Sequence, residues 1–110
     1  KDGKPVLVLG GAGGPTIITA VLQVIIGVVD FGDELAAAQA RPRFHHQFRP
    51  DLIIMEEGAS EELVAGIRSR GHEPMLRNEL GRINAIAWSE KRQKYVGVAD
   101  PRGRGAASAY

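Results

Sequence analysis

Near its amino terminus the sequence reads Pro5-Val6-Leu7-Val8-Leu9-Gly10-Gly11-Ala12-Gly13-Gly14-Pro15, and an apolar run from Thr16 to Val29 follows. A short apolar run bounded by glycines is typical of a buried strand. The glycines predict a loop in which the backbone turns freely or approaches another group closely. Pro15 suits the first position of a helix, where its missing N–H would be unpaired in any case. The sequence therefore predicts a strand over 5–9, a loop over 10–14 and a helix over about 16–29.

The predicted helix is apolar on nearly every side. Its exceptions recur every three to four positions and form one thin stripe: Thr16, Thr19, Gln23 and Gly27. A helix of this kind is buried on most of its surface. Such burial needs more covering than 110 residues readily supply, and the sequence begins without Met. We therefore expect the chain to be a piece of a longer protein.

The remaining elements alternate between helices and strands. Asp33 is expected to cap a short helix through Ala40, and Ser60 a second helix that ends at Gly71. Residues 41–50 form an irregular connection and residues 100–110 an irregular tail. Four further strands are predicted, the last two joined by a hairpin tip at 90–94: 52–57, 74–77, 83–89 and 95–99. This order predicts a mixed α/β or α+β layer fold.

Composition limits the classes of function. The 110 residues amount to one domain, and 14 Lys and Arg against 13 Asp and Glu leave a net charge of +1. With 5% aromatic residues, this balance argues against nucleic acid or an anionic membrane as a partner. The longest apolar run, 17–29, falls short of the ~20 residues that a bilayer requires, so we expect no membrane span. The absence of Cys excludes a disulfide, a thiolate nucleophile and Cys-ligated zinc.

The glycine-rich turn before the helix is the strongest functional signal. Its unobstructed N–H groups and the helix N-terminus can hold an anion, either a phosphate or an oxyanion formed during a reaction. The alternative is a tight turn that needs glycine only for its dihedral angles. Nucleotide binding is disfavoured because Thr16 stands at the third position of the dinucleotide fingerprint and no Lys follows the glycines.

Other polar clusters suggest structural roles. His45 and His46 are adjacent and lack a third ligand at suitable spacing, so we expect no metal site. Glu56 and Glu57 would face opposite sides of a strand and cannot form a catalytic pair by themselves. The basic segment that contains Arg41, Arg43 and Arg49 is interpreted as a loop anchored by its aromatic residues, Phe44 and Phe48.

Three segments together resemble one family, the γ-glutamyltransferases, which hydrolyse glutathione. They are Gly10 to Gln23, Ala40-Arg41-Pro42-Arg43-Phe44-His45-His46-Gln47, and Asp100-Pro101-Arg102. The resemblance covers the C-terminal part of the small subunit and essentially all 110 residues, as a single domain over 1–110. It implies an α+β fold, part of the αββα sandwich of N-terminal-nucleophile hydrolases, with a largely antiparallel mixed sheet.

The resemblance also implies a mechanism. A precursor cleaves itself, and the new N-terminal Thr of the small subunit attacks the γ-glutamyl carbonyl of substrates such as glutathione. The acyl-enzyme then passes its γ-glutamyl group to water, an amino acid or a dipeptide. Gly13 and Gly14 match the glycines whose backbone N–H groups bind the oxyanion, whereas Thr16 and Thr19 belong to the helix and are not the nucleophile. The resemblance implies no cofactor and no metal.

The family's nucleophilic Thr, its substrate-binding Ser pair and its carboxylate-binding Arg all match positions outside these residues. The expected partners are therefore the large subunit and the upstream part of the small subunit, and the 110 residues alone are expected to be inactive. Family members are commonly periplasmic, secreted or surface-anchored. Two alternatives stay open: a non-catalytic module that binds a γ-glutamyl compound or a protein, and a related acylase that acts on other amides.

Overall fold

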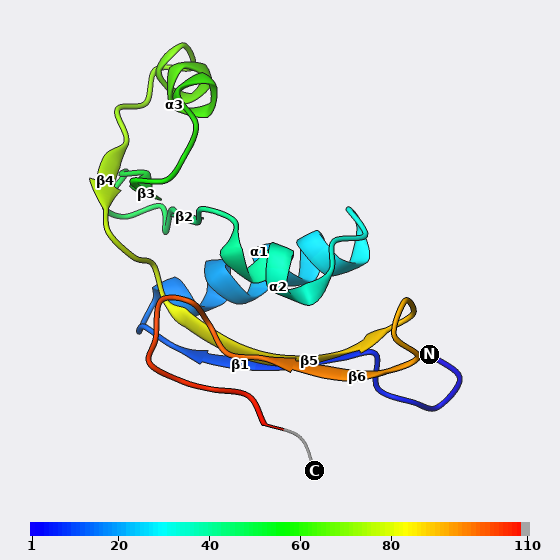
Figure 1. The fold of residues 1–110 in the computed structure, drawn as a ribbon. Helices are drawn as coiled ribbons and strands as arrows, with labels where there is room; N and C mark the ends of the chain where they lie inside the picture. The colour runs from blue at the N-terminus through cyan, green and yellow to red at the C-terminus, as the bar shows by residue number, and fades with distance from the viewer. Residues whose placement is uncertain (109–110) are drawn as a thin grey trace.

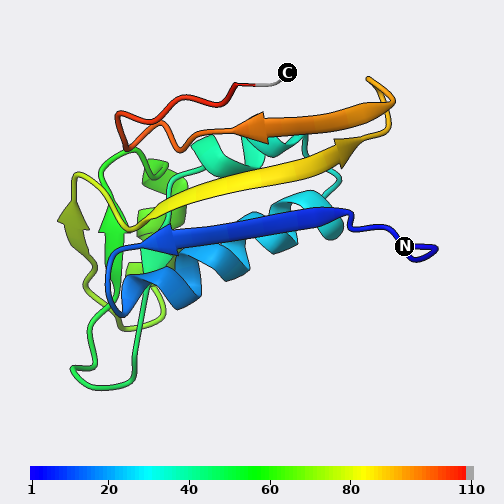
Figure 2. The same cartoon turned by 90° about the horizontal axis from the view of Figure 1, so that it is seen from below.

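A three-stranded antiparallel sheet carries two helices on one of its faces (Figure 1, Figure 2). The computed structural model describes residues 1–108 and is elongated, with extents of 47 × 26 × 23 Å. The sheet has the order β1-β5-β6 and comprises Leu7–Ala12, Arg82–Ser89 and Lys94–Val98. The helices on its inner face are α1 (Thr16–Val29) and α2 (Leu35–Ala40). The expected α+β class is confirmed.

The core lies between this sheet and the two helices. Exposed and buried residues alternate along β5, so that one face of the strand points toward the helices. The buried apolar side chains come from α1, α2 and β5: Ala20, Val24, Leu35, Ala38, Ile83, Ala85 and Ala87. On the opposite face Val8 of β1 is 57% exposed, and its register partner Ile86 of β5 is 51% exposed. Val8 and Ile86 thus form an apolar patch on this outer face that is open to solvent.

Helix α1 has the predicted bounds. Pro15 already has helical dihedral angles (φ −63°, ψ −23°) at its start. A Cβ at Gly27 would lie 2.9 Å from the Ala38 Cβ, so this glycine lets α1 and α2 approach closely. The expected burial on most sides is not reached within residues 1–108, because Ile18 is 75% and Leu22 51% exposed.

The second sheet lies beyond one end of the first (Figure 1). Its strand β3 (Ile54–Glu56) pairs antiparallel with β2 (Phe44–His45) and parallel with β4 (Met75–Arg77). The connection from β3 to β4 carries α3 (Glu61–Arg68), which has no buried residue. As predicted, the Ser60 side chain caps α3 by accepting a hydrogen bond from the Leu63 N–H at 3.2 Å.

Three local predictions need correction. Strand β1 runs on through Gly10 to Ala12, where a loop was expected, because these residues pair with β5. Strand β2 was not predicted at all. Asp33 does not cap α2, since Glu34 takes the N-cap position and the Asp33 carboxylate pairs with Arg41 at 2.6 Å.

The predicted tail over 100–110 is irregular as far as residue 108, and residues 109–110 lie outside the described part. Within residues 1–108, each helix is too short or too polar to cross a bilayer.

Candidate functional site

The glycine turn joins the end of β1 to the start of α1. Gly13 has φ +141° and Gly14 has φ +61°, conformations that side-chain-bearing residues rarely adopt. The carbonyl oxygen of Gly13 accepts a hydrogen bond from Thr16 Oγ1 at 2.9 Å, and that of Gly14 accepts one from the Ile17 N–H at 3.1 Å. Within residues 1–108, neither glycine N–H donates a hydrogen bond. The turn thus has its acceptors satisfied and two donors available.

Gly13 also requires glycine because of what lies beside it. A Cβ at this position would come within 2.8 Å of the Gly81 Cα and 2.8 Å of Thr16 Oγ1. Gly81 itself has φ +67°, and a Cβ there would meet the Ala20 Cβ at 3.2 Å. Around Gly14, in contrast, an added Cβ would meet nothing within 4 Å. Gly13 is therefore fixed by packing, whereas the space beside Gly14 is open.

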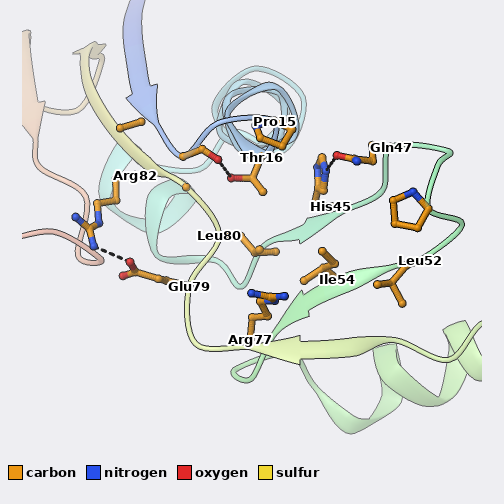
Figure 3. A pocket seen from close by; sticks show the side chains of 14 residues that line it. Pro15, Thr16, His45, Gln47, Leu52, Ile54, Arg77, Glu79, Leu80 and Arg82 are labelled. Carbon is orange, nitrogen blue, oxygen red and sulfur yellow. Dashed lines mark hydrogen bonds and ion pairs between the residues drawn. The ribbon is translucent and has the colours of Figure 1, made fainter.

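A pocket of about 560 Å³ opens beside Gly13 and separates the start of α1 from the second sheet (Figure 3). Its apolar walls include Pro15, Leu52, Ile54 and Leu80. Its polar lining comes from three directions, namely α1, β2 with the segment after it, and the stretch from the end of β4 to the start of β5: Thr16, His45, Gln47, Arg77, Glu79 and Arg82. The arrangement suits a small polar ligand that reaches the Gly13 N–H.

His45 is buried at the pocket wall, with 4% of its surface exposed. Its Nδ1 lies 2.8 Å from Thr19 Oγ1, and its Nε2 lies 2.9 Å from Gln47 Oε1. The Gln47 side-chain NH₂ donates to the Arg49 carbonyl, so its oxygen faces the imidazole and can only accept. His45 therefore donates from Nε2 to Gln47, and its Nδ1 lies against the Thr19 hydroxyl, which also donates to the Thr16 carbonyl at 3.2 Å. These bonds assign the side chain to joining β2 to α1.

Gln23 makes a second connection between α1 and β2. Its Nε2 donates to the Phe44 carbonyl at 2.8 Å, and its Oε1 accepts the Phe44 N–H at 3.1 Å. The side-chain amide thus pairs with Phe44 as a neighbouring strand would. Two members of the predicted polar stripe of α1, Thr19 and Gln23, accordingly face β2.

A buried network of four charged side chains lies behind the turn. Asp100 Oδ2 accepts from Arg43 Nη2 at 2.7 Å, and both side chains are at most 2% exposed. Arg102 pairs with Glu56 at 2.5 Å and with Asp100 at 3.2 Å. The Arg102 guanidinium also donates to the Gln39 carbonyl at 2.7 Å. The network ties α2, β2 and β3 to the segment after β6.

This network holds the segment that packs on Gly13. Arg43 Nη1 donates to the carbonyl oxygens of Leu80 (3.2 Å) and Gly81 (3.1 Å). In the same segment the Leu80 N–H donates to Glu56 at 2.7 Å and the Ile83 N–H to Asp100 at 2.6 Å. Residues 80–83 are thus fixed from both sides, and Gly81 in turn limits where Gly13 can lie.

Both carboxylates of the network stay ionised to lower pH than usual. Burial by itself raises the pKa of Glu56, but hydrogen bonds from Arg102 and from the N–H groups of Arg43 and Leu80 outweigh burial and hold the pKa below its ordinary value. Burial likewise raises the pKa of Asp100. The N–H groups of Ile83 and Arg102, with the Arg43 side chain, reverse that effect and lower the pKa.

The interpretation of the basic segment was wrong. Phe44 is 47% and Phe48 74% exposed, so aromatic burial does not anchor it. The buried Arg43 guanidinium does, through its ion pair and its bonds to backbone carbonyls. Arg43 and Asp100 lie 57 positions apart, and no local pattern links them, so the sequence contains no signal for this ion pair. Glu56 and Glu57 do differ as predicted, since Glu56 is 4% exposed and Glu57 faces solvent.

No group of three or more His, Asp or Glu side chains in the described chain is placed to hold a metal ion. His45 and His46 have separate partners, since the His46 Nε2 lies 2.9 Å from Asp51 Oδ1. The structure brings Gly13, Thr16 and His45 to one pocket. Gly14 lies next to Gly13 in the turn but outside the pocket lining.

The sequence of this chain matches one protein family along its whole length. The sequence profile of the family described as Gamma-glutamyltranspeptidase matches residues 1–110. The chain is 38% identical over 102 residues to a glutathione hydrolase proenzyme of Escherichia coli, a match that covers 93% of this chain and 17% of that protein. A glutathione hydrolase proenzyme of Bacillus subtilis is 33% identical over 111 residues, covering 97% of this chain and 18% of the relative.

Among solved structures, the T380A mutant of Helicobacter pylori gamma-glutamyltranspeptidase superposes with a TM-score of 0.85 at 35% identity. That match covers 94% of this chain and 57% of the other. The chain therefore spans less than a fifth of the length of these curated relatives. Together the profile, the relatives and the fold place this chain in the gamma-glutamyltranspeptidase family.

Proposed function

We propose that this chain is the C-terminal portion of the small-subunit domain of an enzyme that cleaves the γ-glutamyl amide of glutathione. The γ-glutamyl group passes to water, an amino acid or a peptide through an acyl-enzyme on an N-terminal Thr outside these residues. The named relatives, glutathione hydrolase proenzymes, support the reaction class. The free N–H groups of the glycine turn carry the proposal for this chain.

In the proposed reaction the Thr hydroxyl oxygen attacks the γ-carbonyl carbon, and its proton passes to the free α-amine of that Thr. The carbonyl oxygen becomes an oxyanion, which accepts hydrogen bonds from the N–H groups of Gly13 and Gly14. The C–N bond then breaks, and the proton leaves with the amine. Pro15 has no N–H, so the two glycines supply this donor pair. Loss of one such donor lowers turnover by roughly 10²–10³-fold.

Three features support the oxyanion role. Both glycines have positive φ values, and neither N–H donates a hydrogen bond within residues 1–108. Gly81 and Thr16 hold Gly13 in place, so the donors are fixed before substrate binds. The absence of side chains leaves the approach to the turn open.

The apolar surfaces of the chain support its proposed partners, the large subunit and the upstream part of the small subunit. Val8 and Ile86 lie exposed on the outer face of the sheet, and Ile18 and Leu22 lie exposed on α1. Apolar surface of this extent is typical of buried interfaces. It also weighs against a small module that works by itself. We place the enzyme in the periplasm or outside the cell, as the family resemblance implies.

The test compares the activities of two glycine variants of the full-length protein, measured as release of the coloured aniline from a chromogenic γ-glutamyl anilide. Gly14→Ala and Gly32→Ala are matched, because both residues have positive φ (+61° and +71°) and open space around an added Cβ. Gly13→Ala is unsuitable, since its Cβ would collide with Gly81.

Ala keeps its backbone N–H, so any effect comes from the added Cβ, which occupies the open space beside the turn where the carbonyl oxygen would approach. We expect Gly14→Ala to lower kcat by about tenfold or more through displacement of the reacting carbonyl. Gly32→Ala should leave kcat within about twofold of the wild type, since both substitutions strain the backbone equally. Equal kcat values for the two variants would contradict the approach of the carbonyl oxygen to the Gly14 N–H. The 110-residue chain by itself should release no aniline above buffer, and activity there would contradict the placement of the nucleophile.

A further inference from the structure

Two guanidinium groups line the pocket beside Gly13, and they differ in whether a carboxylate pairs with them. Arg82 Nη2 is paired with Glu79 Oε1 at 2.7 Å. Arg77 has no carboxylate partner within residues 1–108, and its Nη2 lies 3.7 Å from Met75 Sδ. Arg77 thus brings a positive charge to the pocket wall that no neighbouring acid neutralises.

The position of Arg77 is fixed at its backbone. It is the last residue of β4 and pairs in register with Glu56 of β3, and its carbonyl accepts the Glu57 N–H at 3.0 Å. Figure 3 shows its side chain rising from β4 toward Leu80 and Ile54. The Arg77 side chain is exposed at this wall, so its charge is accessible to a ligand in the pocket.

We propose that Arg77 binds a free carboxylate on the leaving-group side of the scissile amide, an inference that rests on the proposed function. With the carbonyl oxygen at Gly13, the ligand beyond the amide nitrogen extends into the pocket that Gly13 and Arg77 both line. The cysteinylglycine part of glutathione ends there in a carboxylate, and so does an amino acid or dipeptide acceptor. A guanidinium matches a carboxylate with two parallel hydrogen bonds.

The first test uses donors with and without that carboxylate in the full-length protein. Glutathione has it, whereas γ-glutamyl-p-nitroanilide does not. In Arg77→Met, the ratio of kcat/KM for glutathione to kcat/KM for the anilide should fall about tenfold, the size of one charge-assisted contact. Arg77→Lys should recover part of this ratio. Arg70→Met, an exposed cation outside the pocket, should leave the ratio within about twofold.

The second test separates the leaving group from the acceptor. Glycylglycine and glycylglycinamide differ only at the carboxylate, so the preference of the wild type for glycylglycine should disappear in Arg77→Met if the acceptor uses this site. A loss confined to glutathione assigns the site to the donor's leaving group. Unchanged ratios in both tests, or an equal loss for all four ligands, would overturn the proposal.

The proposed function can fail separately from the Arg77 site. If the full-length wild type cleaves neither donor, the γ-glutamyltransferase proposal fails. Calorimetry of glycylglycine and glycylglycinamide on the same protein then decides about Arg77. Tighter binding of the carboxylate form that is lost in Arg77→Met supports the site, and equal binding of both forms overturns it.

Discussion

The substitution Asp100→Asn tests whether the buried charge network fixes the segment behind the glycine turn. Each carboxylate oxygen of Asp100 accepts two hydrogen bonds: Oδ2 from Arg43 and the Ile83 N–H, and Oδ1 from the Arg102 backbone and side chain. An Asn side chain must point its NH₂ at two donors whichever way it is turned. The substitution therefore removes two contacts and leaves the Arg43 charge, which is 2% exposed, without its counter-ion.

The structure gives the size of the effect. Breaking a buried ion pair from one side costs about 3–5 kcal/mol, because the remaining charge stays buried and unpaired. The loss should concentrate in residues 80–83, whose backbone depends on Asp100 and Arg43. A fall of about 3 kcal/mol in the local opening free energy corresponds to amide exchange faster by on the order of 100-fold.

Amide hydrogen exchange over residues 80–84, followed by mass spectrometry in the full-length protein, measures this opening directly. The matched control is Glu73→Gln, whose exposed pair with Arg68 should contribute nothing measurable to exchange in its own segment. Exchange in Asp100→Asn that rises by less than about fivefold, under 1 kcal/mol, would refute the claim that the network holds this segment.

Three further predictions follow from the same geometry. The folded-state pKa values of Glu56 and Asp100 lie below their ordinary values of 4.5 and 3.8, so the stability that these two carboxylates contribute is complete above those values and is lost as the pH falls below them. Amide exchange over residues 80–84, corrected for its intrinsic rate, should therefore accelerate at low pH. A flat pH profile would contradict the assigned pairs. Gln23→Met removes both hydrogen bonds to Phe44 and should lower the unfolding free energy by about 1–2 kcal/mol, visible as faster exchange of the Phe44 N–H; unchanged exchange would show that β2 is held otherwise. Gly27→Val inserts a side chain where α1 and α2 touch and should cost about 1–3 kcal/mol in thermal unfolding, and a wild-type Tm would mean that the helices pack less closely than described.

The sequence contained enough to predict the elements that have local signals. Pro15 and the polar residues after Val29 marked both ends of α1, and Ser60 marked the start of α3. Strands β5 and β6 were predicted over 83–89 and 95–99, joined by the hairpin tip at 90–94, and the structure confirms them. The glycines before the predicted helix start indicated a candidate anion site, and that role stays a prediction; β1 extends further into the turn than expected.

Features that depend on contacts between residues far apart in the sequence could not be predicted from local patterns. Strand β2 is two residues long and is held by the side chain of Gln23, which no strand periodicity reports. Glu56 and Arg102 lie 46 positions apart, so their pairing follows only from the tertiary fold. The same holds for Gly81, whose contact with Gly13 explains why Gly13 cannot accept a side chain.

The central claim is that the N–H groups of Gly13 and Gly14 bind the oxyanion. A crystal structure of the full-length protein with a tetrahedral γ-glutamyl phosphonate bound at the nucleophile tests it most directly. The account predicts one phosphonate oxygen within about 2.7–3.1 Å of the nitrogen atoms of both glycines. An oxygen held by other donors, with both glycine N–H groups directed elsewhere, would contradict it.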